Sequence, residues 1–164
     1  MSTRTAQLIR VADEVWIVTA LLHRDHPQKT DFTVQEIVER AKDESLTGKL
    51  RPGVYVHAVQ HCVANRPPNP GRYRMLFETR KDHRRLFRRG DSYDPRREGS
   101  KTAPDRADIP AEYASLLDWY EREYAPKGRS RESDPLLALR GSGGKIWADE
   151  HADEYVRRLR EGWE

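Results

Sequence analysis

Apolar residues in the first 65 positions recur with the spacing of helices. Over residues 6–23 they return every three or four positions, at Leu8, Val11, Val15, Val18 and Leu22, which predicts one amphipathic helix. The pair His26-Pro27 follows it. Because a residue before proline disfavours helical backbone, we expect the helix to end there.

A second helix is predicted from Thr33 to about Asp43. Thr33 and Glu36 have the spacing of a capping box, in which the hydroxyl and the carboxylate each satisfy a backbone N–H of the other residue. Phe32 and Ile37 occupy the positions of a hydrophobic staple around the same start. The run Ser45-Leu46-Thr47-Gly48 predicts a turn, so we expect the helix to end just before it.

A third helix is predicted over residues 52–65, with Pro52 in its first turn. At 100° per residue, one face carries the apolar set and is expected to be buried: Val54, Tyr55, Ala58, Val59 and Cys62. The opposite face carries Gly53, Val56, His57, Gln60 and Ala64. The proline-rich run at 67–71 predicts a loop after the helix.

The pattern then changes to alternation, which is typical of a β-hairpin. Tyr73, Met75 and Phe77 alternate with polar residues over 72–79, residues 80–83 predict a turn, and 84–88 predict the return strand. We expect Tyr73 and Phe77 to lie in the core beneath the hairpin. Three helices and a hairpin are the order of a winged helix-turn-helix domain, so we predict a mainly α fold with a small β-hairpin, over residues 1–90.

The rest of the chain is poorer in apolar residues. Residues 91–109 are expected to be a linker, 110–125 an amphipathic helix, and 126–164 a tail with a glycine-rich break at 141–144. No run of about 18 apolar residues occurs, so we expect no membrane span. The N-terminus lacks the pattern of a secretory signal and there is a single Cys, which together indicate a cytoplasmic protein.

The distribution of charge along the chain indicates a candidate function. The chain has a net charge of +3, but residues 51–90 hold ten basic and two acidic residues. A strongly basic stretch over a helix and a hairpin favours a polyanion as partner. We therefore expect this part to bind duplex DNA. The candidate DNA-binding residues are Arg51, His57, Gln60, His61, Arg72, Arg74, Arg80, Lys81, Arg84 and Arg85.

Each assignment has an alternative. The outer face of the third helix, with Gln60 suited to adenine and His57 to guanine, is predicted to read bases, but it is also compatible with a solvated surface. The arginines of the hairpin are predicted to follow phosphates, and the alternative is a sheet edge protected by charge. His57 and His61 lack the further ligands of a metal site, and no nucleophile or phosphate-loop pattern is complete. We expect no enzyme activity, metal or cofactor.

Two segments also resemble known families. The run RPGVYVHAVQHCVANRPPNPGRYRMLFET, with RRLFRRGD after it, resembles a family of uncharacterised bacterial winged-helix domains over about residues 8–91. The segments DPLLALRGSG and IWADEHADEYVRRLREGW resemble the C-terminal part of VapB-type antitoxins of toxin–antitoxin pairs, over residues 134–163. The second resemblance implies a bacterial transcription regulator whose tail neutralises a toxin, such as a PIN-type ribonuclease.

The tail has large apolar residues but too few for a core of its own, which favours folding on a partner. Its candidate partner-binding residues are Leu136, Leu137, Leu139, Arg140, Trp147, Tyr155, Leu159 and Trp163. The alternative is docking onto its own domain or onto the second copy of a homodimer. Two other functions stay open: an accessory subunit of a nuclease or restriction system, and a winged-helix adaptor for protein interactions.

Overall fold

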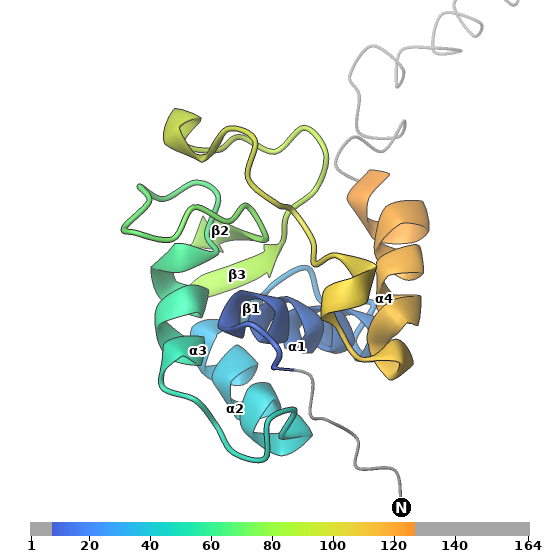
Figure 1. Cartoon of the computed structure of the whole chain (residues 1–164). Coiled ribbons are helices and arrows are strands. Elements are labelled where there is room, and N and C mark those ends of the chain that lie inside the picture. Colours follow the sequence, from blue (N-terminus) through green and yellow to red (C-terminus); the bar gives the residue numbers. More distant parts are fainter. Residues whose placement is uncertain (1–7, 127–164) are drawn as a thin grey trace, which may run out of the picture. The chain divides into compact units, whose positions relative to one another are not determined.

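The computed structural model describes residues 8–126, and about half of these are helical (Figure 1). The first part of the chain contains α1 (Val11–Asp25), β1 (Phe32–Thr33), α2 (Val34–Glu44), α3 (Gly53–Val56), η1 (His57–His61), β2 (Leu76–Arg80) and β3 (His83–Leu86). Shorter helical segments follow: η2 (Pro95–Arg97), η3 (Arg106–Asp108), η4 (Ala111–Tyr113), α4 (Ala114–Trp119) and η5 (Tyr120–Tyr124). Three helices and a hairpin therefore occur in the expected order.

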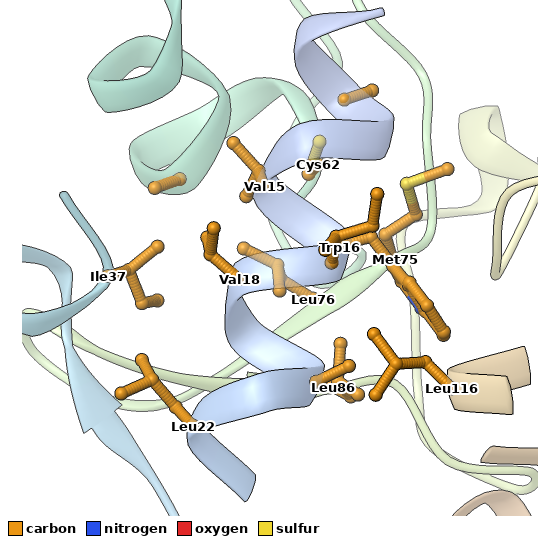
Figure 2. Close-up of a cluster of buried hydrophobic side chains, with 14 of the residues drawn as sticks. Val15, Trp16, Val18, Leu22, Ile37, Cys62, Met75, Leu76, Leu86 and Leu116 are labelled. Carbon is orange, nitrogen blue, oxygen red and sulfur yellow. The ribbon is translucent and has the colours of Figure 1, made fainter. Parts of the chain in front are cut away.

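Helix α1 lies at the centre of the core (Figure 2). It is buried on nearly every side, and Trp16 is completely inaccessible to solvent. The Trp16 side chain points toward Met75 and Leu116, and its ring meets the Tyr120 ring edge-on with centroids 5.5 Å apart. Helix α1 also packs against α2, α3, η1, β3 and α4, which explains why it exposes so little surface.

The start of α2 confirms the predicted cap. The Glu36 backbone N–H donates to the Thr33 hydroxyl at 3.0 Å, and the Thr33 N–H donates to the Glu36 carboxylate at 2.7 Å. Phe32 and Ile37 are both buried, as the staple requires. The helix ends at Glu44, one residue beyond the predicted end, and Ser45 follows in the left-handed conformation with φ of 50°.

The third helix is shorter than predicted. After one α-helical turn in α3 it becomes a π-helical turn in η1, and it ends at His61 rather than at Asn65. Tyr55 is exposed although it was expected in the core, and Ala64 is fully buried although it was placed on the outer face. Tyr55 lies in the α-helical turn, about 100° around the helix from the buried Val54, and so at the edge of the apolar face. Ala64 lies beyond the end of the helix at His61, so the helical spacing does not apply to it.

The sheet has three antiparallel strands in the order β1-β3-β2, so β1 joins the predicted hairpin. β1 has only two residues, which is too short for alternation to identify. The inward positions of the hairpin are Leu76, Arg84 and Leu86, whereas Phe77 is only half-buried. The prediction that Phe77 is a core residue is wrong because Leu76 takes the inward position of β2, and the Phe77 ring lies on the other face, 4.5 Å from the Arg85 guanidinium carbon.

Residues 91–109 do not form a free linker. Arg97 is completely buried, and the described residues 8–126 belong to one compact unit, so the predicted domain boundary at residue 90 falls inside the fold. The predicted amphipathic helix does occur, as η4, α4 and η5 in succession. Its buried side carries Leu116, Leu117, Tyr120 and Tyr124. Composition failed here because few residues hold the 91–109 stretch to the core: the buried ones are Arg97, Pro104 and Ile109.

No helix within residues 8–126 combines the length and the apolar character that a membrane span requires.

His23 makes the stability of this fold depend on pH. Burial, together with Arg88 and Arg85, lowers the pKa of His23 from 6.5 to about 3. Its Nε2 accepts a hydrogen bond from the Leu86 backbone N–H at 3.3 Å, which requires an unprotonated nitrogen. The folded state therefore binds fewer protons than the unfolded state below pH 6.5. The contribution of the unprotonated His23 side chain to stability is complete above pH 6.5 and is lost as the pH falls toward 3.

The variant His23→Gln should reduce this loss. Between pH 6.5 and 4.5, we expect the free energy of unfolding of the variant to fall by about 2 kcal/mol less than that of the wild type. Comparison of the two proteins is needed because burial and Asp108 raise the pKa of Asp13 to about 6, which acts in the opposite direction over the same range. Urea titrations at several pH values measure the difference. If the free energy of unfolding changed equally with pH in the two proteins, His23 would contribute nothing to the pH dependence.

Candidate nucleic-acid interface

Two buried arginines hold the end of the third helix. The last carbonyl groups of a helix have no partner inside the helix and need donors from elsewhere. Here Arg84 of β3 donates to the carbonyls of Ala58 and Val59, at 3.0 and 3.3 Å. Arg97 of η2 donates to the next two, those of Gln60 and His61, at 2.9 and 2.8 Å. The positive guanidinium groups also suit the negative end of the helix dipole.

Arg97 extends the same role to the loop that follows the helix. Its guanidinium donates to the carbonyls of Tyr73 at 2.7 Å, Arg66 at 2.8 Å and Pro67 at 3.3 Å. No carboxylate of the described residues lies within 4 Å of it, so backbone oxygens alone neutralise the donors. Burial lowers the pKa of Arg97, but a guanidinium keeps its proton at any ordinary pH. Arg97 therefore fixes the position of the loop relative to η1.

The structure corrects the expectation for Arg84. Its side chain is 1% exposed, and its guanidinium also lies 3.2 Å from the Glu78 carboxylate. A phosphate cannot reach it without unfolding the hairpin. The alternation of the strand explains this position, because Arg84 and Leu86 both face inward from β3.

Three more of the predicted DNA contacts are used inside the fold. Arg51 donates twice to the buried Glu14 carboxylate, at 2.9 and 2.5 Å, and so ties the start of α3 to α1. Arg85 makes a two-pronged ion pair with Asp91, at 2.7 and 2.8 Å. Arg74 donates to the Ser100 carbonyl and stacks on the Tyr93 ring at 4.4 Å. These contacts correct the expectation that their guanidinium groups are free for phosphates.

The polar residues of η1 face a loop rather than open solvent. The Gln60 amide donates to the Pro67 carbonyl at 3.2 Å. Residue 71 is glycine because a Cβ there would lie 2.8 Å from the Cβ of His61. The two nitrogens of His57 are shielded and have no partner among the described residues, and burial lowers its pKa to about 4. In this arrangement Gln60, His57 and His61 are half-buried beneath the loop.

The large side chains that the third helix exposes are apolar. Tyr55 is 58% exposed and Val56 is 44% exposed. The sequence placed Tyr55 on the buried face, so it was missed as a candidate contact. Arg97 was missed because it lies in a stretch whose composition indicated a linker, and no local signal marks a guanidinium that binds carbonyls.

Three predicted cations are exposed on the loop and the hairpin. Arg72 and Lys81 have no ion pair within the described part of the chain, and Arg80 approaches Asp31 only at 3.9 Å. The hairpin turn is held close to the domain, because the Val34 N–H donates to the Asp82 carbonyl at 2.9 Å. The hairpin therefore does not project far, and its free charges are confined to the turn.

Seven of the ten cations in residues 51–90 thus contact a described group: Arg51, Arg66, Arg74, Arg80, Arg84, Arg85 and Arg88. Over residues 8–126 as a whole there are 21 basic and 19 acidic residues. The high local charge of the sequence is largely balanced once the chain is folded.

The predicted partner-binding residues of the tail, from Leu136 to Trp163, lie outside the described residues. Among residues 8–126, no three side chains of His, Cys, Asp or Glu come together in a group that could hold a metal ion. Cys62 is fully buried, and burial raises the pKa of its thiol.

Comparison with known proteins gives no match to a family model, a curated protein or a solved structure.

Proposed function

We propose that residues 8–126 form a winged-helix domain that binds duplex DNA, with α3 and η1 as the helix that enters the major groove. The observation that carries this proposal is the attachment of the third helix to the hairpin. Arg84 joins η1 to β3, so that one rigid unit carries the exposed side of the helix and the cations at the hairpin turn. A helix in the major groove with a positively charged hairpin beside it is a known way of docking on DNA.

The contacts we propose differ from those expected from the sequence alone. Tyr55 and Val56 are the exposed side chains of the helix, and apolar side chains recognise the methyl group of thymine. Arg72, Arg80 and Lys81 are the exposed cations that would contact phosphates. In a bacterial cell such a domain would regulate transcription. Toxin neutralisation by residues 134–163 is a separate proposal that rests on the sequence of the tail.

Removal of the two charges at the hairpin turn tests the proposal. The double variant R80A/K81A should bind a mixed-sequence duplex about ten-fold more weakly than wild type at about 100 mM salt, because two phosphate contacts are lost. Fluorescence anisotropy of a labelled duplex measures this. The matched control is R106A/R122A, which removes the same charge from two exposed arginines in η3 and η5.

The control should bind within two-fold of wild type. Equal weakening by both double variants would mean that only the net charge matters, and the proposed docking face would then be wrong.

A second candidate function is recognition of a protein, which the exposure of Tyr55 and Val56 favours. Large apolar side chains on a surface are typical anchors of protein interfaces. Absence of duplex binding by a folded full-length chain would favour this candidate over DNA.

A further inference from the structure

A pocket of about 510 Å³ lies on the other side of α1 from the third helix. It is bounded by the C-terminal end of α1, the loop 26–30, the segment after β3 and the helices α4 and η5, whereas α3 lies beyond α1 (Figure 1). This volume is within the range of sites for small ligands. The pocket shares no lining residue with the proposed DNA-binding face.

Its lining is positively charged. Arg24, Lys29 and Arg88 contribute cations, and Glu123 is the carboxylate among the lining residues. Lys29 is bound to Glu36 at 2.6 Å, whereas the guanidinium groups of Arg24 and Arg88 make no ion pair with a carboxylate of the described residues. The Asp91 carboxylate accepts from the backbone N–H of Arg88 instead. The pKa of the neighbouring His23 is lowered mainly by burial, and Arg88 and Arg85 lower it further. The pocket therefore favours an anion.

Of these cations, Arg88 is the best placed to bind an anion. Its guanidinium carbon lies over the Tyr124 ring, 4.5 Å from the ring centre, and both residues line the pocket. Its Nε–H is shielded from solvent and has no acceptor among the described residues. A buried donor without an acceptor is costly, so an acceptor supplied by a ligand would be favoured. A guanidinium also matches the geometry of a carboxylate or phosphate.

Aromatic rings form the other wall. The rings of Trp119 and Tyr124 lie 5.3 Å apart at an angle of 37°. Trp119 is half-buried, so part of its indole surface is open to a ligand. A flat ring could stack there while an acidic group on the same molecule meets the cations.

We propose that this pocket binds a small aromatic anion, with its carboxylate or phosphate paired to Arg88 and Arg24 and its ring against Trp119. An aromatic carboxylic acid and a nucleoside monophosphate share this chemistry. The pocket is a site additional to the DNA-binding face, and its occupation does not depend on whether that face binds DNA.

Calorimetric titration of the full chain tests the proposal, with salicylate and adenosine 5′-monophosphate as probes. Benzyl alcohol serves as a neutral ring without the acid. At least one of the anions should bind saturably with a Kd below about 1 mM. The anion that binds identifies the ligand class. Benzyl alcohol should bind at least ten-fold more weakly, because it cannot use the cations.

Two variants locate the site. R88Q and R24Q should each weaken binding of that anion about ten-fold, and R24Q changes an exposed side chain, so it should leave the fold intact. The matched control is R122Q, an exposed cation of η5 that does not line the pocket. Unchanged thermal melting confirms folding. The proposal is overturned if neither anion binds at about 10 mM, or if R122Q weakens binding as much as R24Q does.

Discussion

Replacement of Arg97 by Ala should destabilise the domain by about 4 kcal/mol or more. The change removes the guanidinium donors to five backbone carbonyls of η1 and the loop after it. The carbonyls of His61, Arg66 and Tyr73 then lose their donor, whereas two keep another one: the Val63 N–H still donates to Gln60, and the Gln60 amide to Pro67. Each buried acceptor left without a donor costs roughly 1–3 kcal/mol. Since single domains are stable by about 5–15 kcal/mol, this variant should be near the limit of folding.

Two further variants test whether the loss of stability comes from the donors of Arg97. R97K keeps the charge but has three donors on a compact ammonium group, so it should lose roughly half as much stability as R97A. R96A changes the neighbouring arginine, which is exposed and paired with Asp94, and should cost less than about 1 kcal/mol. Urea unfolding followed by circular dichroism measures all three. If R97A unfolded within 1 kcal/mol of R96A, the carbonyl contacts would not support the fold.

A chain that ends at residue 90 should not fold, whereas one that ends at residue 128 should. The shorter chain lacks four buried side chains of the α4–η5 segment, which are Leu116, Leu117, Tyr120 and Tyr124. Burial of each contributes about 2 kcal/mol, so their loss, together with that of Arg97, removes about as much free energy as a domain of this size has to spare.

Chemical-shift dispersion in amide NMR spectra of the two fragments is the measurement. The fragment 1–128 corresponds to the compact unit and should give dispersed signals. The fragment 1–90 should give the narrow range of an unfolded chain. Dispersed signals from 1–90 would restore the domain boundary that the sequence suggests.

Local signals in the sequence predicted the first half of the fold well. The capping box at Thr33 and Glu36 and the stop at Pro27 depend only on neighbouring residues, and they placed the start of α2 and the end of α1 within two residues. The start of α1 was predicted at residue 6 but lies at Val11, where no side-chain cap marks it. The length of the third helix depends on Arg84 and Arg97, which are distant in the chain. Periodicity does not record such partners, so the helix was predicted too long.

In the candidate site, too, the sequence predicts what depends on local composition but not what depends on distant partners. Composition shows that residues 51–90 are basic, but not that Arg51 is paired with Glu14 or Arg85 with Asp91. The partners come from other elements, and net charge counts a buried arginine and a free one alike. Arg72, Arg80 and Lys81 could be identified as exposed only after folding placed the other cations. The sequence therefore predicted a larger nucleic-acid surface than the structure offers.

The salt dependence of duplex binding tests the proposed DNA interface most directly. Each phosphate contact contributes about 0.9 to the slope of the logarithm of the binding constant against the logarithm of salt concentration. The triple variant R72A/R80A/K81A should therefore bind with a slope that is less steep than that of the wild type by about 2.7. A slope unchanged from wild type would show that these three exposed cations do not contact DNA, and it would contradict the proposed interface.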